Sequence, residues 1–430
     1  MTERRPGIVH VGVGAFARAH LAWYTQHAGE WGITAFTGRS PRAADALVAQ
    51  DCRYTLVTRA ASGDTAEVVD AIVAAHPGSD DTAWRRVVAS PETTIVTLTV
   101  TEQGYRPGSD VPARLVAGLD ARRAAGSGRI ALVSLDNLTH NGAVLRDAVA
   151  SAVADPELQA WIDEHVTFPS SMVDRITPAT TDADVEALAD LPGALPGDRV
   201  PVVTEPFAEW VLEDAFDGID RPAWDTAGVR LVDDVTPYEQ RKLWLLNGSH
   251  SLLSYLGLER GHETVAAAMD DRVCRAAVED LWDEAALELP LPPDEVAAAR
   301  AALVDRFANP RIRHTLRQIA SGGSQKLPVR VVDVVRHRLA RDPAAGIGPG
   351  AATAIAAWWS HVTTQPDLVD DAGAPGADSD VHDVLAVIAP DLDTAAVVEA
   401  VTAAADRIRA ARTTASRTTT STSTDEGVPA

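Results

Sequence analysis

Cysteine is scarce in this chain: Cys52 and Cys274 are the only two among 430 residues. They form no CxxC pair and do not stand at metal-ligand spacing with histidine. This argues against a disulfide framework and against a zinc site. We therefore predict a metal-independent protein that works in a reducing compartment, the cytoplasm.

Long apolar runs are also missing. The N-terminal segment lacks the apolar region of a secretory signal, and no uncharged run reaches the ~18 residues that can span a bilayer. Basic residues are few as well, 38 Lys and Arg against 61 Asp and Glu, so the net charge is −23. This charge argues against a nucleic-acid or membrane partner, although a local cluster of Lys and Arg could still bind an anionic small molecule.

The length of the chain exceeds what one hydrophobic core usually serves, which predicts two domains. In residues 1–236, short β-rich runs alternate with helical stretches, a pattern typical of a Rossmann-like, doubly wound parallel sheet. From Pro237 onward apolar residues recur at helical spacing, which predicts a mainly α-helical, substrate-binding domain over 237–412. The Ser/Thr-rich segment 413–430 is predicted to be disordered. The expected strands are 8–12, 33–37, 94–100, 130–135, 200–204 and 229–235, and the expected N-terminal helices are 16–26, 42–49, 113–125 and 143–154.

A glycine-rich turn follows the first expected strand and opens a helix. Its first glycine permits a tight turn, its second lets the backbone approach a pyrophosphate, and the helix N-terminus favours the anion. A turn without a ligand is the alternative, which the position on the first strand of an alternating β/α half makes weaker. The motif reads Gly12-Val13-Gly14-Ala15-Phe16-Ala17.

The second expected strand ends without the acidic residue that usually binds the adenosine ribose of NAD. Arg39, Ser40 and Arg42 stand there instead and could receive the 2′-phosphate of NADP. The residues alone therefore favour NADP, unless these arginines simply face solvent.

The densest polar cluster lies in an otherwise apolar helix and contains Lys242, Asn247 and His250. At ~100° per residue these three side chains fall within ~140° of one helical face. The alternative is an amphipathic helix with a surface lysine, but polar groups in an apolar setting need partners, which favours a ligand.

Two further polar clusters follow expected strands. One contains Asn137 and lies at the carboxyl end of a strand, where open α/β sheets bind ligands. The other contains Asp174. The alternatives are a helix cap for the first cluster and a surface ion pair for the second.

In these motifs the chain resembles the long-chain mannitol dehydrogenase family, which includes mannitol 2-dehydrogenases, fructuronate reductases and related polyol enzymes. The Lys-x4-Asn-Gly-Ser-His-Ser pattern is the most specific of the shared motifs. One departure is that the family often reads Asp-Gly-Ser-x-Lys where this chain has Gly322 before Gly323. The matching stretches are 8–20, 97–105, 136–142, 167–178, 205–214, 242–251 and 325–330.

The resemblance implies a role for each matching residue. Lys242 is expected to be the acid–base group of a direct hydride transfer between a secondary carbinol and the nicotinamide. Asn137 and Asn247 would polarise the reacting oxygen, His250 would orient the substrate, and Asp174 would bind its hydroxyls. Lys326 and Arg330 lie in the stretch that closes the substrate pocket.

The resemblance also ranks the ligands. Related enzymes use NAD without the ribose-binding acid, so NAD is expected first, with NADP as the alternative. The expected substrates are a sugar alcohol and its ketose (mannitol and fructose) or a hexonate and its keto-hexuronate (mannonate and fructuronate). Mannitol 1-phosphate is the next alternative, and a non-catalytic dinucleotide-binding sensor is the alternative of another class. The acidic surface and the resemblance permit a monomer.

Overall fold

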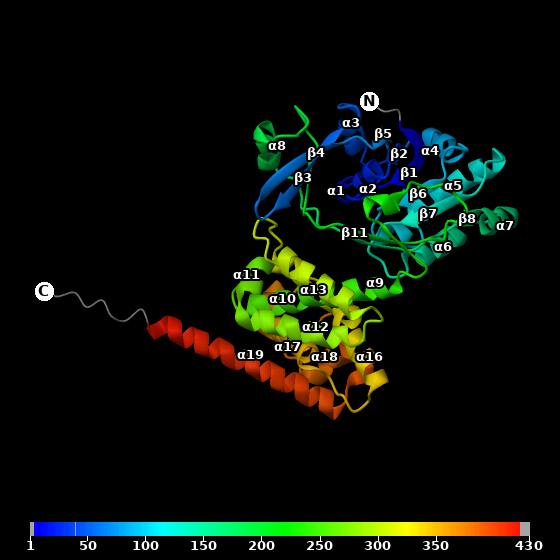
Figure 1. Cartoon of the computed structure of the whole chain (residues 1–430). Coiled ribbons are helices and arrows are strands. Elements are labelled where there is room, and N and C mark those ends of the chain that lie inside the picture. The colour runs from blue at the N-terminus through cyan, green and yellow to red at the C-terminus, as the bar shows by residue number, and fades with distance from the viewer. Residues whose placement is uncertain (1–3, 39, 422–430) are drawn as a thin grey trace. The chain divides into compact units, whose positions relative to one another are not determined.

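The structure is a computed structural model that describes residues 4–38 and 40–421, with side chains placed up to residue 411. The chain forms two compact units, Met1–Tyr238 and Glu239–Ala430, and each is described by itself (Figure 1). The described part contains no helix that is long and apolar enough to cross a membrane.

The first unit is built on a sheet of six parallel strands in the order β5-β2-β1-β6-β7-β8. This is the strand order of a dinucleotide-binding fold, with a switch point between β1 and β6, so the predicted Rossmann-like fold is confirmed. The strands are β1 (Arg5–Val11), β2 (Trp31–Phe36), β5 (Ile72–His76), β6 (Ile95–Leu98), β7 (Ile130–Ser134) and β8 (Val166–Thr167).

Successive strand residues point to opposite sides of the sheet, and helices bury the side chains on both faces. Ile8 packs on one face with the first three helices, whereas Val9 packs on the other with the next four. Trp84 and Leu119 are among the buried side chains that cover the second face. The helices on the first face are α1 (Ala15–Ala19), α2 (Leu21–His27) and α3 (Arg42–Val48), and those on the second are α4 (Asp81–Val88), α5 (Asp110–Ala124), α6 (Asn141–Ala152) and α7 (Pro156–His165).

Two of the expected strands are real but belong to other sheets. The expected strand 200–204 is β10, which pairs with β3, and the expected strand 229–235 is the short β12, which pairs with β11. The parallel sheet already ends at β8, whose two residues the sequence pattern did not reveal. The helix expected over 16–26 is interrupted at His20, which ends α1 and begins α2. One small sheet consists of β3 (Tyr54–Ala60), β4 (Gly63–Val69) and β10 (Val202–Thr204). The other consists of β9 (Ser171–Asp174), β11 (Glu209–Glu213) and β12 (Arg230–Val232), and α8 (Asp182–Ala187) lies between β9 and β10 in sequence.

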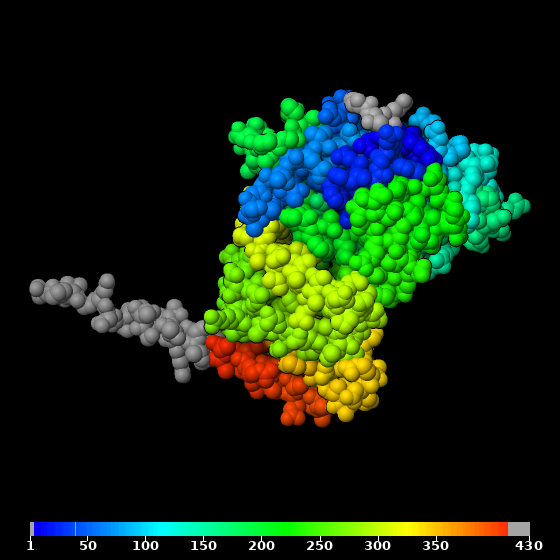
Figure 2. Space-filling view, in the orientation of Figure 1, coloured from blue at the N-terminus to red at the C-terminus, as the bar shows by residue number. Residues whose placement is uncertain are grey.

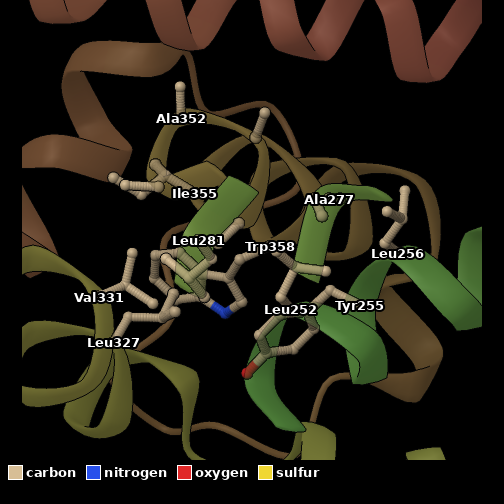
Figure 3. Close-up of a cluster of buried hydrophobic side chains, with 14 of the residues drawn as sticks. Leu252, Tyr255, Leu256, Ala277, Leu281, Leu327, Val331, Ala352, Ile355 and Trp358 are labelled. Carbon is tan, nitrogen blue, oxygen red and sulfur yellow. The ribbon is translucent and has the colours of Figure 1, made fainter. Parts of the chain in front are cut away.

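The second unit is helical, as predicted, and its core surrounds α10 and α17. Figure 3 shows Leu252 and Tyr255 of α10 beside Trp358 of α17, with Leu327 and Val331 on the far side. All five side chains are buried. The helices are α9 (Thr236–Arg241, which begins in the first unit), α10 (Gly248–Glu259), α11 (Val265–Asp270), α12 (Arg272–Ala286), α13 (Pro293–Phe307), α14 (Leu316–Ala320), α15 (Gly323–Leu327), α16 (Asp333–Arg341), α17 (Pro349–Thr364), α18 (Val381–Ile388) and α19 (Ala395–Ser421).

The helix expected to run on from Pro237 is not a regular α-helix. It widens into a π-helix, η4 (Lys242–Asn247), before α10 begins, and a second π-helix, η5 (Pro328–Val332), separates α15 from α16. Pro328 has no backbone N–H to donate, which accounts for the disturbed helix register at η5.

The last helix, α19, extends into the segment that we predicted to be disordered. Alanines from the preceding stretch pack it on α17, and its backbone hydrogen bonding continues to Ser421. The disordered tail over 413–430 stays a prediction: the backbone of α19 is drawn as helical up to Ser421, and 422–430 lie outside the described residues. Figure 2 shows the red surface of α19 along one side of the helical unit.

Candidate active site

The glycine-rich turn lies at the carboxyl end of β1, beside the switch point of the sheet. Gly12 has a φ of +99°, and a Cβ there would lie 2.0 Å from the backbone oxygen of Thr99, so only glycine fits. At Gly14, by contrast, a Cβ would meet no atom closer than the Gly12 oxygen at 3.9 Å. Because Gly14 precedes the first turn of α1, the space beside it can take the pyrophosphate of a dinucleotide.

A buried histidine supports this turn from below. The ring nitrogens of His10 lie 2.9 Å from Thr97 Oγ1, 3.1 Å from Thr99 Oγ1 and 3.2 Å from the Gly12 oxygen. Burial lowers the pKa of His10 to about 4, so the ring is neutral at physiological pH. The sequence analysis missed His10, because it lies within an apolar strand. The ring links β1 to the end of β6 and supports the glycine-rich turn.

The end of β2 was expected to select between NAD and NADP. Arg39 lies outside the described residues, so its predicted role in cofactor binding remains a prediction. Arg42 is exposed at the start of α3, and its backbone N–H donates to Ser40 Oγ at 3.4 Å. Ser40 and Arg42 both follow the end of β2 and are exposed, so their contact with a 2′-phosphate remains a prediction.

Asn137 is exposed in the loop that follows β7, and the two residues beside it are held firmly. The side chain of Asp136 accepts hydrogen bonds from the loop after β6, and its backbone oxygen accepts one from Leu138 N at 2.8 Å. Asn141, which is buried, donates to the oxygens of Asp136 at 3.1 Å and Ser171 at 2.7 Å. The Asn137 loop is thereby joined to β9.

Asp174 ends β9 and is buried. It lies opposite Glu209 of β11 in the antiparallel register. Its neighbour Arg175 is also buried, donates to the backbone oxygen of Ala19, and stacks on Trp23 with the guanidinium 4.9 Å from the ring centroid. The first unit thus places the predicted residues Gly12, Asn137 and Asp174 on three separate strand ends.

In the second unit, the π-helix η4 carries Lys242 at its start and Asn247 at its end. A π-helix bonds each residue to the one five positions away, so residues five apart become neighbours along the axis. Gly248 N–H donates to the oxygen of Leu243 in this register. In a regular α-helix the two side chains would be ~140° apart; the π-helix brings Lys242 and Asn247 onto nearly the same face.

Two backbone carbonyls of the widened helix accept hydrogen bonds from side chains. The oxygen of Leu245 accepts from Ser249 Oγ at 2.5 Å and from Trp282 Nε1 at 3.0 Å. The oxygen of Asn247 accepts from Arg330 Nη1 at 3.4 Å. These side-chain donors stabilise the π register, and they explain why serine and tryptophan lie beside the predicted catalytic motif.

His250 is buried on the first turns of α10, and its Nε2 has no hydrogen-bond partner among the described residues. Burial, His314, Arg306 and Arg330 hold the pKa of His250 well below its usual range. Its ring centroid lies 4.8 Å from that of His314 and 4.9 Å from that of Phe307. A neutral imidazole with an unused nitrogen can bind a hydroxyl group, which fits the role predicted for His250.

Lys326 lies on α15 and Arg330 on η5, and the charge of Arg330 acts on both His250 and Lys326. Arg330 also donates to Ser251 Oγ at 3.2 Å, and burial lowers the pKa of Arg330 to about 10. Lys326 donates to the oxygen of Ile319 at 3.2 Å, and its pKa is lowered by burial and by Arg330. Asn247, His250, Lys326 and Arg330 are therefore brought together in one unit.

Composition carries a further indication that the sequence analysis missed. Of the 38 Lys and Arg residues only two are lysines, and they are Lys242 and Lys326. A chain that uses arginine for its other basic side chains keeps lysine at two positions, both in the predicted site. Lysine differs from arginine in its compact ammonium group and in its readily lowered pKa, so both positions call for those properties.

One group in the described part of the chain has the composition of a metal site: His262, Asp271 and Cys274, whose ligand atoms lie within 4.8 Å of one another. Its acceptors are already used, because Asp271 accepts from Arg260 at 2.7 Å and from His262 at 3.0 Å. Asp271 also caps α12 through the N–H of Val273. Burial raises the pKa of Cys274 to about 12, so its thiol is protonated. This group is accounted for as a helix cap with a charged arginine in it.

Comparison with known proteins assigns a family to both units. Residues 6–226 match the family described as the mannitol dehydrogenase Rossmann domain, and residues 234–409 match the mannitol dehydrogenase C-terminal domain. A D-mannonate oxidoreductase of Escherichia coli is 38% identical over 370 residues, which cover 77% of this chain and 75% of that protein. A polyol:NADP oxidoreductase of Gluconobacter oxydans is 36% identical over 78% of this chain and 76% of its own length. The structure of Pseudomonas fluorescens mannitol 2-dehydrogenase in a ternary complex with NAD and D-mannitol is similar with a TM-score of 0.76 and 33% identity, covering 96% of this chain and 94% of that one.

Proposed function

The chain belongs to the mannitol dehydrogenase family, whose members are oxidoreductases acting on CH–OH groups with a nicotinamide cofactor, and we propose that it interconverts a sugar alcohol and its ketose, or a hexonate and its keto-hexuronate, with Lys242 as the acid–base group. The observation that carries this proposal is the π-helix η4, which aligns Lys242 with Asn247. Two polar side chains on one face, five residues apart, can address a single oxygen atom.

The cofactor is NAD, with NADP as the alternative. The residues that would hold it are Gly12, Val13 and Gly14 of the turn and Ala15 and Phe16 at the start of α1. Open space beside Gly14 supports this fit. When bound, the nicotinamide supplies the hydride acceptor or donor. The name of the polyol:NADP relative keeps NADP open, as do Arg42 and the predicted contribution of Arg39.

The acid–base chemistry would belong to the protein. Lys242 Nζ takes the hydroxyl proton of the carbinol during oxidation and returns it during ketone reduction. Asn137 and Asn247 donate hydrogen bonds to that oxygen, where negative charge develops, in the manner of an oxyanion hole. No metal ion is required for these steps.

Substrate hydroxyls further along the chain would be bound by His250 and Asp174. The buried Nε2 of His250, which has no hydrogen-bond partner in the described part of the chain, supports this, because an unpaired buried nitrogen costs free energy that a substrate hydroxyl would recover. Lys326 and Arg330 would bind either a hydroxyl or a carboxylate. The first case corresponds to mannitol and fructose, the second to mannonate and fructuronate, and a phosphate in the same place corresponds to mannitol 1-phosphate.

Steady-state kinetics test the proposal. The purified chain is assayed with NAD(H) and NADP(H) on mannitol, arabinitol, fructose, mannonate, fructuronate and fructose 6-phosphate, with 2-propanol as the control. We expect one polyol or hexonate to exceed 2-propanol in kcat/KM by at least about 10³-fold, because a pocket built for several hydroxyls rejects analogues that lack them. Comparable kcat/KM for 2-propanol would contradict the multi-hydroxyl pocket. NADH binding without turnover of any substrate would favour the dinucleotide sensor.

A further inference from the structure

The loops that follow β6 and β7 are joined by a single carboxylate, that of Asp136. Its Oδ1 accepts a hydrogen bond from the backbone N–H of Thr101 at 2.9 Å. Its Oδ2 accepts from the N–H of Val100 at 2.9 Å and from the hydroxyl of Tyr105 at 2.6 Å. The Tyr105 hydroxyl also lies 2.7 Å from Ser134 Oγ, which closes a network over the ends of both strands. Burial and Asp136 raise the pKa of Tyr105, so its hydroxyl remains a donor.

This network holds a strained backbone. Thr101 is β-branched and has a φ of +63°, a conformation that costs about 1–3 kcal/mol and that persists only where the surroundings enforce it. The N–H of this residue is one of the three donors to Asp136. The carboxylate therefore keeps the loop after β6 in a conformation that it would not adopt by itself.

The same residue fixes the backbone on both sides of Asn137. The side chain of Asp136 is bound to the loop after β6, and its backbone oxygen accepts from Leu138 N and from Asn141 Nδ2. Asn137 stands between Asp136 and Leu138, and its side chain is exposed at the strand ends. The hydrogen bonds of Asp136 thus fix the backbone from which the side chain of Asn137 projects after β7.

We infer that Asp136 is a positioning residue, which aims Asn137 at the reacting oxygen by clamping the loop after β6 to the loop after β7. The inference rests on the proposed function, in which Asn137 polarises that oxygen. Hydrogen bonds to a developing charge depend strongly on placement, and a displacement of ~1 Å can cost about 10²-fold in rate. The matching stretches 97–105 and 136–142 are the two halves of this clamp.

The first test is a pair of graded substitutions. Asp136→Asn puts an amide N–H against a backbone N–H, so at least one bond of the clamp is lost. We expect kcat to fall about 50-fold, while the KM for the best substrate and the Kd of NADH change less than about threefold. Tyr105→Phe removes one donor and leaves both backbone bonds, so kcat should fall only about fivefold. A loss of NADH affinity as large as the loss of kcat would overturn the inference, because the clamp would then serve the fold of the cofactor unit as a whole.

Thr101→Gly separates positioning from mere stabilisation. Glycine adopts a positive φ without strain, so this substitution alone should leave kcat within about twofold and should not lower Tm. Added to Asp136→Asn, it should recover most of the lost Tm but not the lost kcat. Recovery of kcat together with Tm would show that Asp136 only offsets the strain of Thr101.

A double-mutant cycle with Asn137→Ala completes the experiment. If Asp136 acts through Asn137, the double variant should have the kcat of Asn137→Ala alone, within about twofold. Fully multiplicative losses would overturn the inference and leave the role of Asn137 intact. Unchanged kcat in Asn137→Ala itself would instead contradict the proposed role of Asn137, so the two failures are distinguishable.

Discussion

The two units hold their predicted site residues by different means. In the first unit these residues lie on loops at the ends of strands, and side chains such as His10 and Asp136 fix the loops from beneath. In the second unit they lie within helices: Lys242, Asn247 and Arg330 are in the two π-helices, and His250 and Lys326 are in the α-helices next to them. A loop can be aimed by a single carboxylate, whereas a side chain on a helix can be re-aimed only by changing the register of the helix.

The difference has an energetic side. The strand-end loops satisfy their backbone groups by hydrogen bonds to neighbouring strands and to buried polar side chains. In the π-helix η4, backbone carbonyls also accept hydrogen bonds from the side chains of Ser249, Trp282 and Arg330. Substitutions in the first unit should therefore separate stability from cofactor affinity, and substitutions in the second should separate binding from turnover.

The largest effect is expected at Lys242. Lys242→Ala removes the proposed acid–base group from the π-helix and should lower kcat at least 10³-fold, about 4 kcal/mol of barrier. NADH affinity should change less than about threefold, because the glycine-rich turn belongs to the other unit. The measurements are kcat at saturating substrate and NADH fluorescence titration. Lys242→Arg is the matched control, which keeps the charge and should remain as inactive as the alanine variant, since arginine does not release its proton. Turnover of Lys242→Ala within tenfold of the parent would remove Lys242 from the mechanism.

The next effect compares two glycines of the turn. Gly12→Ala should destabilise the first unit by about 2 kcal/mol or more, because a Cβ at φ +99° would lie 2.0 Å from the Thr99 oxygen. Gly14→Ala should leave Tm unchanged, since its Cβ would lie no closer than 3.9 Å to the Gly12 oxygen, and should weaken NADH binding about tenfold or more. Thermal unfolding and NADH titration measure the pair. Equal losses of Tm in both variants, with no loss of affinity in Gly14→Ala, would contradict the pyrophosphate site.

These comparisons show why the sequence predicted one unit better than the other. The parallel sheet and the glycine turn follow from two local rules, the alternation of strands with helices and the spacing of glycines, and both were visible around Gly12. The π-helix is not visible in that way, because the residues of 242–247 are as compatible with an α-helix and only the surrounding donors, Ser249 and Trp282, reveal the wider register. Strands β3, β4, β5, β9 and β11 were not predicted either; in β4 and β11, apolar and polar side chains alternate little.

The identity of the site residues was predicted from motifs, whereas their supports were not. His10, Asp136 and His314 contact residues distant in the chain, and no spacing in the sequence links them to the residues that they hold. The relation of Lys242 to Asn247 shows the same limit, because helical periodicity placed them ~140° apart. Lys326 was predicted from the resemblance, and the rarity of lysine in the chain is a second, independent indication of it.

A pH-dependent effect tests the first unit. The pKa of folded His10 is about 4, below the 6.5 of an unfolded histidine, so protonation favours the unfolded chain. The contribution of His10 to stability is fully present above pH 6.5 and is lost as the pH falls toward 4, by about 3 kcal/mol at ~1.4 kcal/mol per pH unit. Urea unfolding at pH 7.0 and pH 4.5 should show this loss in the parent chain and a smaller loss in His10→Gln, which cannot protonate. If His10→Gln loses as much unfolding free energy between pH 7.0 and pH 4.5 as the parent chain does, the His10 ring is protonated in the folded protein at pH 4.5.

The smallest effect is a shift in the titration of one lysine in the second unit. Because the chain contains only Lys242 and Lys326, reductive methylation with ¹³C-formaldehyde should give two side-chain signals besides that of the terminal amine, and Lys326→Arg assigns them by deleting one. Burial and the neighbouring Arg330 lower the pKa of Lys326, so its signal should titrate below the 10.5 of an ordinary lysine. Arg330→Met removes the cation and should move this titration upward, whereas Asp371→Asn removes an opposing anion and should move it downward.

The same titration bears on the substrate. If Lys326 binds a carboxylate, the KM for the hexonate should increase as the pH is raised through the pKa of Lys326, because the lysine loses its charge. The KM for the polyol should not change in this way. A signal that titrates at 10.5 or above in the parent chain would show that Lys326 is a solvated side chain, and the kinetic difference between the two substrates should then be absent.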